Sequence, residues 1–372
     1  MARVDERQPV IDRLAATGVD DDRRRGRGAV TNPSGRYEPI ARVDEDDGWG
    51  SAGALAPFKT HVTLETPRSI ISRNESPDIP FDRSINPYRG CEHGCIYCFA
   101  RPTHAYMGLS PGLDFESHLF AKSNAAELLE RELSVKGYKP AMMALGTNTD
   151  PYQPIEREHK IMRGILEVLA RFNHPVGIVT KSALVLRDVD ILAPMAAKGL
   201  TKVYLSVTTL DPDLARRMEP RASTPAKRLD AVRQLHAAGI PAGVMVAPII
   251  PALNDHEIER ILEAAAAARA SDVNYIFLRL PHELKDLFRE WLHDHYPGKL
   301  NHVMSLVKDA HGGADYRARF GERMKGDGVY AALIAQRFKV ATERLGLNRE
   351  RQKLRTDLFK VPAKRGDQLA LF

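Results

Sequence analysis

The feature that most constrains this chain is a six-fold alternation of short apolar runs and longer helical segments over residues 82–293. Continuous apolar runs are typical of parallel strands that are covered on both faces. The longer segments carry apolar residues at helical spacing. Successive right-handed βα units either curl into a barrel or open into a doubly wound α/β sheet. Six units are too few for a closed eight-fold barrel, so we expect a partial (β/α)6 TIM-type barrel with an open side.

The periodicity also sets the boundaries of the expected elements. The expected strands cover residues 84–88, 141–145, 176–180, 203–207, 242–247 and 275–278. The expected helices cover residues 125–133, 155–172, 185–197, 225–238, 256–270 and 283–293. Asn124 and Glu127 have the spacing of a capping box at the start of the first helix. About two more helices are expected within residues 300–346.

Both ends of the chain differ from this core. Residues 1–55 contain charge runs without apolar periodicity, so we expect a poorly ordered, disordered-type N-terminal extension. The barrel core is expected over residues 56–295, and residues 296–372 are expected to form C-terminal helices and a basic tail. Residues 301–372 hold 15 basic and 8 acidic residues, which accounts for the net charge of +6. This basic end suggests a polyanionic partner such as a nucleic acid, although a solvated helical surface has the same signature.

Composition excludes several other classes of protein. No stretch of 18 apolar residues exists, so a membrane span is not expected. The segment Met1–Arg7 is charged and no apolar run follows it, which argues against a signal peptide. Three cysteines cannot form a disulfide scaffold. We therefore expect a cytoplasmic protein.

The three cysteines of the chain lie within eight residues. Cys91, Cys95 and Cys98 form a C-x3-C-x2-C pattern directly after the first expected strand. Thiols that only filled the core would be scattered, so the clustering predicts a metal site. A structural zinc site would need a fourth ligand such as His93, His104 or a distant histidine. A cubane iron–sulfur cluster on three thiolates would keep one iron open, which is typical of a reactive site.

This cysteine pattern, with an aromatic residue before its last member and a six-fold βα repeat behind it, resembles the radical S-adenosylmethionine (SAM) superfamily. The resemblance covers roughly residues 82–282. It implies a [4Fe–4S] cluster whose open iron binds SAM. It further implies that reductive cleavage of SAM gives a 5′-deoxyadenosyl radical, which abstracts hydrogen from the substrate. An electron donor such as flavodoxin or ferredoxin would be a partner.

Within the superfamily, the sequence is most similar to the spore-photoproduct-lyase-like branch, often labelled DNA repair photolyases, and there to an uncharacterised bacterial subgroup. The motifs that carry this resemblance are Asn-Pro-Tyr-Arg-Gly at residues 86–90, the polar run at 146–154 and Glu-Pro-Arg at 219–221. The resemblance implies a lyase-like enzyme with a nucleic acid as the candidate substrate.

The resemblance also carries cofactor-binding roles to five residues near strand ends. Tyr97 would lie against the adenine of SAM, Thr149 would contact its amino group, and Asp150 would bind the ribose hydroxyls. Lys181 would face the carboxylate or the ribose, and Ser206 is a further candidate for the ribose. From the residues alone, a core aromatic, an Asx-type turn, a surface lysine and a backbone-bonded hydroxyl remain the alternatives.

Two more motif residues bear on the reaction. Arg221 could reach the SAM or substrate side, or pair with Glu219. Spore photoproduct lyase uses an additional cysteine as hydrogen donor, and alignment on Thr149 and Asp150 puts Asn148 at that position. An amide has no weak X–H bond to donate, so direct thymine-dimer repair by that route is not expected.

Two other functions fit the cysteines. One is an iron–sulfur or zinc protein that binds nucleic acid without catalysis, and the other is a redox sensor with a labile cluster. A barrel of 200 residues argues against the first, because small metal-stapled modules do not need one. The tail over residues 349–365 has seven basic and two acidic residues. We expect it to guide a phosphate backbone toward the open side of the barrel.

Overall fold

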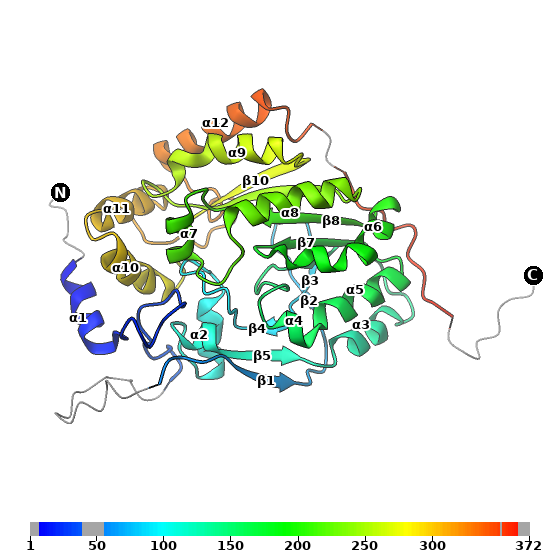
Figure 1. Ribbon diagram of the computed structural model, residues 1–372, viewed down its shortest axis with the longest axis horizontal. Helices are drawn as coiled ribbons and strands as arrows, with labels where there is room; N and C mark the ends of the chain where they lie inside the picture. Colours follow the sequence, from blue (N-terminus) through cyan, green and yellow to red (C-terminus); the bar gives the residue numbers. More distant parts are fainter. Residues whose placement is uncertain (1–6, 39–55, 350–351, 364–372) are drawn as a thin grey trace, which may run out of the picture.

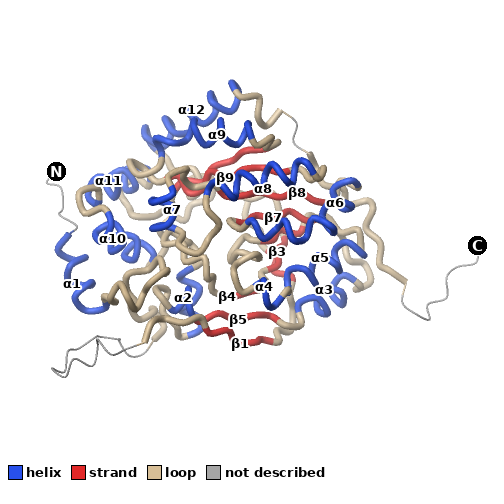
Figure 2. The backbone as a smooth tube through the Cα atoms, in the orientation of Figure 1, coloured by secondary structure: helices blue, strands red, loops and turns tan. Residues whose placement is uncertain are grey.

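The computed structural model describes residues 7–38, 56–349 and 352–363. One seven-stranded sheet runs in the order β10-β9-β8-β7-β6-β3-β2, and the helices lie on its outside (Figures 1 and 2). The edge strand β2 (Ile71–Arg73) is antiparallel to its neighbour. The other six strands are parallel: β3 (Arg83–Ile85), β6 (Met143–Leu145), β7 (Val176–Thr180), β8 (Thr201–Ser206), β9 (Ala242–Ile249) and β10 (Asp272–Phe277).

Helices follow each parallel strand, which confirms the partial α/β barrel. The helical elements of the barrel are α3 (Ala125–Leu133), α4 (Glu156–His159), α5 (Ile161–Arg171), the 3-10 helix η3 (Ala183–Asp188), α6 (Val189–Ala197), α7 (Pro212–Met218), α8 (Pro225–Ala237), the 3-10 helix η4 (Asp255–Glu257), α9 (Ile258–Ala267) and α10 (Leu284–His295). Two further C-terminal helices are α11 (Leu300–Ala310) and α12 (Gly328–Arg344).

Apolar faces explain why these helices pack on the sheet. In α5, the side chains of Ile161, Ile165, Val168 and Leu169 are all buried, as their helical spacing predicts. They belong to the same core as the inward residues of β7, in which buried and half-buried positions alternate. Burial of one such side chain contributes roughly 1.5–3 kcal/mol. The apolar residues whose spacing predicted the barrel are therefore the ones that stabilise it.

The first expected strand differs from the prediction because it is interrupted. Its residues form β3 and then β4 (Tyr88–Arg89), with Pro87, which has no N–H to donate, between them. Strand β4 joins a second sheet with the order β1-β5-β4, which the sequence did not predict. Its other strands are β1 (His61–Glu65) and β5 (His118–Lys122), and the 3-10 helix η2 (Arg101–Met107) and α2 (Asp114–Ser117) lie between β4 and β5 along the chain.

The capping box predicted at the start of α3 is wrong. The side chain of Asn124 makes no capping hydrogen bond. Its amide instead donates to the carbonyl of Pro67, at 3.3 Å. Tertiary contact with the segment before β2 thus replaces the local cap.

Part of the N-terminal segment, expected to be poorly ordered, packs on the body. Residues 7–38 include α1 (Arg7–Thr17), which lies against α10 (Figure 1). Arg13 Nε donates to the buried carboxylate of Glu290 at 2.8 Å, and the Thr31 hydroxyl donates to its other oxygen at 2.6 Å. These polar contacts have no periodic signature in the sequence. Residues 39–55 of the expected extension lie outside the described residues.

A loop over residues 311–327, here called the strap, bridges the open side of the barrel. Phe277 at the end of β10 donates its N–H to the carbonyl of Met324, at 2.8 Å. Gly321 N and the Arg323 guanidinium both donate to the carboxylate of Asp78, which lies between β2 and β3. β10 and β2 are the two edge strands of the seven-stranded sheet, so the strap connects one edge of this sheet to the loop that follows the other edge strand.

The basic tail lies at the other end of the barrel. Arg355 N donates to the carbonyl of Gly199, and Lys360 N donates to that of Phe172, each at 3.0 Å. Both acceptors precede strands, so the described tail covers the amino ends of β7 and β8. In Figure 1 this segment runs past α6, on the side away from α7 and α10. The prediction that the tail guides a phosphate backbone to the open side is therefore wrong for residues 352–363.

Among the described residues, no helix combines the length and the apolar character needed to span a membrane.

The packing of the tail generates a prediction about acid stability. Phe359 contacts the rings of Tyr138 and His174. Burial lowers the pKa of His174 to about 4. Its Nδ1 lies 3.0 Å from the carbonyl of Pro175, and its Nε2 lies 2.9 Å from the Tyr138 hydroxyl. A neutral ring that donates from Nδ1 and accepts at Nε2 satisfies both contacts.

We expect the unfolding free energy to fall between pH 6.5 and 4, because the unfolded chain binds a proton that folded His174 takes up only near pH 4. The loss reaches at most about 3 kcal/mol. In His174→Gln this decrease should shrink, as measured by urea unfolding at several pH values. The exposed His236→Gln variant serves as the control and should keep the parent's pH dependence. An equal slope in both variants would contradict the assignment.

Candidate functional site

The cysteine loop, residues 90–98, follows β4 at the edge of the barrel. Cys91 and Cys95 are buried, and Cys98 is partly exposed. Cys91 N donates to the carbonyl of Phe115 at 2.9 Å, and Cys98 N donates to that of Cys95 at 3.2 Å. Gly94 has a φ of +68°, and a Cβ there would come within 2.6 Å of the Glu116 carboxylate. Only glycine fits this turn.

Gln153 fixes the loop on both sides of Cys91. Its Oε1 accepts from Glu92 N at 2.8 Å, and its Nε2 donates to the carbonyl of Gly90 at 3.2 Å. Gln153 is fully buried and comes from the polar run that follows β6. The end of the second parallel strand is thereby joined to the cysteine loop.

Arg101 holds the loop from beneath. This fully buried side chain donates to the carbonyls of Cys95 at 2.9 Å, Gly94 at 3.0 Å and Gly112 at 2.8 Å. It also forms an ion pair with the buried carboxylate of Glu116 at 2.5 Å. Charged side chains are buried only when they are paired and hydrogen-bonded, and both conditions are met here.

The N-terminal segment completes the partners of Glu116. The backbone N–H groups of Gly28 and Ala29 each donate to its carboxylate at 2.8 Å. Arg27 Nη1 donates to the backbone carbonyl of Glu116 at 2.6 Å. A Cβ on Gly28 would lie 1.9 Å from the carbonyl oxygen of Gly94, so this segment packs directly under the cysteine loop. No pattern in the sequence predicts a role for any of these residues.

The three thiols lie in an environment that disfavours their charged form. Burial raises the pKa of Cys91, Cys95 and Cys98 above the ordinary value for cysteine. Proximity to Asp150 and to the other two sulfurs raises the pKa of Cys91 further. The ammonium of Lys181 acts in the opposite direction on Cys95 and Cys98. Thiolates at this site therefore need a positively charged partner.

Asp150 lies in a dense set of donors. Its Oδ1 accepts from the Thr180 hydroxyl at 2.6 Å and from Tyr152 N at 2.9 Å. Its Oδ2 accepts from Lys181 N at 2.8 Å and lies 3.3 Å from His93 Nδ1. Burial alone would raise the pKa of Asp150, but His93 and these hydrogen bonds lower it to about 2. The bond from Tyr152 N is also the local turn that the sequence left open as an alternative role.

Tyr97 and Lys181 meet beside the cysteines. Lys181 Nζ lies 5.5 Å from the centroid of the Tyr97 ring, a cation–π distance. The Tyr97 hydroxyl donates to the carboxylate of Glu219, which also accepts from the hydroxyl of Thr208 and pairs with the guanidinium of Arg228. Tyr97 is thus held by a buried polar network.

The remaining motif residues have defined partners. Thr149 is buried, and its hydroxyl donates to the carbonyl of Tyr88 at 2.9 Å. Ser206 is buried at the end of β8, and its carbonyl accepts from Arg228 at 2.9 Å. Arg221 pairs with Glu92 rather than with Glu219, which correspondingly pairs with Arg228.

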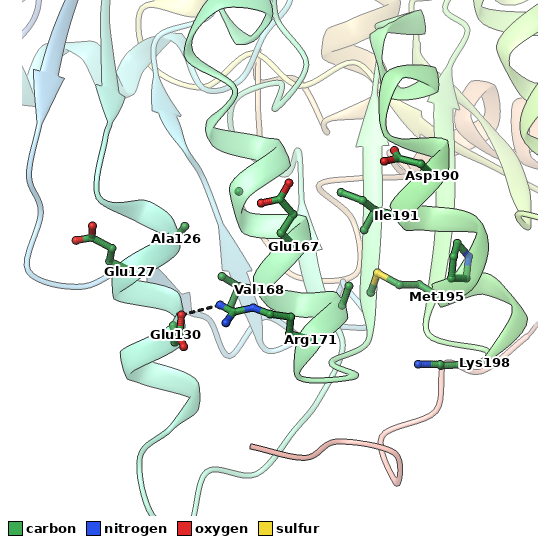
Figure 3. Close-up of a pocket in the computed structure, with 13 residues that line it drawn as sticks. Ala126, Glu127, Glu130, Glu167, Val168, Arg171, Asp190, Ile191, Met195 and Lys198 are labelled. Atoms are coloured by element: carbon green, nitrogen blue, oxygen red, sulfur yellow. Dashed lines mark hydrogen bonds and ion pairs between the residues drawn. The ribbon is translucent and has the colours of Figure 1, made fainter. Parts of the chain in front are cut away.

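A separate groove of about 620 Å³ lies on the outer helices. Figure 3 shows that α3, α5 and α6 line it and that the Glu130–Arg171 ion pair, at 2.6 Å, joins two of them. Its lining includes none of the cysteine-loop residues and none of the five residues predicted to bind SAM. The chemistry predicted from the sequence is therefore not located in this groove.

Sequence comparison identifies a superfamily and several relatives. Residues 85–265 match the radical SAM superfamily. An uncharacterised protein of Mycobacterium tuberculosis is 38% identical over 232 residues, which cover 62% of this chain and 68% of that protein. An uncharacterised protein of Methanocaldococcus jannaschii is 31% identical over 173 residues, which cover 46% of this chain and 62% of that protein.

Structural comparison finds the same fold in spore photoproduct lyase. The complex of that protein with dinucleoside spore photoproduct has a TM-score of 0.55 and 17% identity, and the match covers 76% of this chain and 79% of that one. A variant with bound AdoMet and the same dinucleoside also has a TM-score of 0.55, with 16% identity and the same coverage. At this identity the likeness establishes the fold.

The buried pair beneath the cysteine loop generates a prediction about stability. In Glu116→Gln, the buried Arg101 loses its counter-charge and an amide group faces the N–H groups of Gly28 and Ala29. We expect the unfolding free energy to fall by about 3–5 kcal/mol, as when one partner of a buried pair is removed. Urea unfolding measures this change. Arg233→Ala, which breaks an exposed pair with Asp230, should stay within about 0.5 kcal/mol of the parent. Similar small effects in both variants would contradict the role of Glu116.

Proposed function

This chain belongs to the radical SAM superfamily, and from that premise we propose that Cys91, Cys95 and Cys98 hold a [4Fe–4S] cluster to which SAM binds. The chain is an enzyme of this superfamily. When bound, the cluster and SAM supply a one-electron cleavage that starts hydrogen abstraction from a substrate. The observation that carries the proposal is that one rigid loop presents three buried or half-buried thiols beside the Lys181 ammonium.

The three cysteines form one candidate ligand set, because they lie near enough to affect one another's pKa. Within residues 7–38, 56–349 and 352–363, no group of three or more Cys, His, Asp and Glu side chains that could hold a single metal ion is found. The superfamily to which the chain belongs is what favours the cubane over a zinc site.

The electrostatics of the loop fit the same group. Metal binding requires deprotonated thiols, and burial raises the thiol pKa values here. Iron supplies the positive charge that makes buried thiolates stable. Lys181 contributes in the same direction, and Arg101 acts likewise on Cys98. The loop thus has the properties of a ligand set rather than of inert core thiols.

On the SAM side, we assign to each residue the role that the resemblance to the superfamily implies. The Lys181 ammonium is the cation for the carboxylate of SAM, and Tyr97 lies beside it to contact the adenine. The hydroxyl of Thr149 uses its proton on the Tyr88 carbonyl, so its lone pairs are left to accept from the amino group of SAM. Asp150 and Ser206 are assigned to the ribose.

For the substrate, we propose a nucleic acid. Its support is the fold shared with spore photoproduct lyase, which has been solved with a dinucleoside spore photoproduct, together with the basic character of the chain. A thiol cannot return hydrogen to the product, because all three cysteines lie in the loop and Asn148 follows β6 where that lyase has a donor cysteine. The reaction therefore differs from thymine-dimer repair by a thiol route.

Cysteine replacement tests the cluster. Cys91→Ala, Cys95→Ala and Cys98→Ala should each abolish assembly of the cluster, because all three thiolates hold one cubane. The measurements are iron and sulfide content and the visible absorption after anaerobic reconstitution. The parent, supplied with SAM and dithionite, should form 5′-deoxyadenosine, and the variants should not. Normal iron content in any single variant would contradict the ligand set.

The same assay separates the alternatives. A brown parent that forms no 5′-deoxyadenosine would support a redox sensor. A colourless parent with one bound zinc would support a nucleic-acid-binding protein without catalysis. Either outcome would replace the proposed function.

A lysine variant tests the SAM pocket. Lys181→Met removes a charge-assisted contact but keeps the aliphatic stem, so we expect SAM to bind about 10- to 100-fold more weakly, equivalent to roughly 1.5–3 kcal/mol. Equilibrium dialysis of SAM against the reconstituted protein measures the change, and iron content should remain that of the parent. Lys339→Met, at an exposed position on α12, is the matched control. Unaltered SAM affinity in Lys181→Met would place the carboxylate elsewhere.

A further inference from the structure

Aromatic rings and arginines alternate on a surface beside the cysteine loop. Phe99 directly follows Cys98, and its side chain is 41% exposed. The guanidinium carbon of Arg279 lies 4.8 Å from the centroid of this ring. The same guanidinium lies 5.9 Å from the ring centroid of Tyr316 and donates to its hydroxyl at 3.3 Å. Arg279 therefore connects the cysteine loop to the strap.

The strap extends this surface with a further exposed ring. Phe320 is 56% exposed, and the guanidinium carbon of Arg323 lies 4.7 Å from its centroid. The backbone around Phe320 is fixed, because Gly321 N and Arg323 both bind Asp78. Arg319 precedes this ring, and its side chain is 77% exposed and pairs with Glu322 at 3.0 Å. The Phe320 ring is therefore exposed on an anchored backbone.

Position in the barrel links this surface to the chemistry. Arg279 lies just after β10, at the carboxyl end of a parallel strand, where α/β folds place their sites. The strap occupies the open side between β10 and β2. The Nε of Arg279 is buried, and within the described part of the chain it has no hydrogen-bond partner. The guanidinium thus has a donor still to be satisfied.

We propose that this aromatic surface, formed by Phe99, Arg279, Tyr316, Arg319 and Phe320, binds unpaired nucleotides of the substrate. The inference rests on the proposed function, since it names the part of the chain that holds the substrate of the same site. Exposed rings stack on nucleobases of any sequence, and arginines add phosphate and cation–π contacts. In an intact duplex the base faces are covered, so the surface selects single-stranded or extruded nucleotides.

The alternative is that these arginine–aromatic contacts have only a structural role and bind no ligand. Such contacts would bury their rings, whereas Phe99 and Phe320 remain 41% and 56% exposed. The basic tail is not an alternative location for the substrate, because its described part lies at the amino ends of the strands. Among the described residues of the C-terminal region, we therefore assign the strap to the substrate.

Binding of short oligonucleotides tests the surface. The probes are labelled 12-residue single-stranded DNA and RNA and the corresponding duplex, and fluorescence anisotropy measures their binding to the anaerobically reconstituted protein at low salt. Single strands should bind more tightly than the duplex. Phe320→Leu, which removes the ring but keeps an apolar side chain, should raise the Kd about 5- to 100-fold. Phe320→Tyr, which keeps the ring, should stay within about twofold of the parent.

A charge variant supplies an independent readout. Arg319→Ala should reduce the slope of log K against log salt by about 0.7, as expected for one phosphate contact with a single strand. Arg344→Ala, an exposed arginine on α12 paired with Glu263, should leave both Kd and slope unchanged. Equal thermal midpoints for the strap variants and the parent show that the fold is retained.

The outcomes distinguish this inference from the proposed function. Formation of 5′-deoxyadenosine by the parent without any oligonucleotide reports on the cluster and SAM alone. Suppose that the parent cleaves SAM but binds no oligonucleotide, binds the duplex more tightly than single strands, or has the same Kd as Phe320→Leu. Each of these results overturns the aromatic surface and leaves the proposed radical chemistry in place. If oligonucleotides bind as expected but SAM is not cleaved, the surface stands and the proposed function fails.

Discussion

The buried pair of Arg101 and Glu116 is the constraint on which the cysteine site depends. Turns that are already fixed between three thiols lower the ordering cost of binding one cluster. Arg101 fixes them by binding the carbonyls of Gly94 and Cys95. Its charge can be buried only because Glu116 neutralises it, and Glu116 is in turn satisfied by two backbone N–H groups of the N-terminal segment. The cysteine loop is therefore preorganised by Arg101, by Glu116 and by the N-terminal segment.

Most other charges of the site are likewise satisfied within the protein. Glu219 accepts from Tyr97, Thr208 and Arg228, and Asp150 accepts from the Thr180 hydroxyl and Lys181 N and lies 3.3 Å from His93. Fully connected polar networks rigidify a site, whereas partly satisfied ones destabilise it. Lys181 stands apart, because its ammonium lies over a ring and beside two sulfurs. Its neighbours are a ring and two sulfurs rather than a carboxylate, which suits a cation that must meet a ligand.

Sequence patterns predicted those parts of the molecule that depend on local spacing. The six βα units follow from periodicity, and the cysteines from their density within eight residues. Strand β1 escaped prediction because His61–Glu65 is largely exposed and carries no apolar run. The partners Glu116 and Gly28 are far apart in sequence, and no spacing rule links a carboxylate to backbone N–H groups. For Arg221, the choice between Glu219 and Glu92 depended on tertiary distances that a single sequence does not contain.

The path of the N-terminal segment has a consequence for how the enzyme is assembled. Gly28 and Ala29 bind beneath the cysteine loop, while Arg13 and Thr31, on either side of them, bind Glu290 on α10. The N-terminal segment thus joins the cysteine loop to α10, the helix that follows the last strand of the barrel. During synthesis, the support of the cysteine loop is incomplete until α10 has left the ribosome. A chain cut back to the family-matched residues 85–265 would keep the Arg101–Glu116 pair but lose the N–H groups of Gly28 and Ala29 that bind Glu116, so the support of its three ligands would be incomplete.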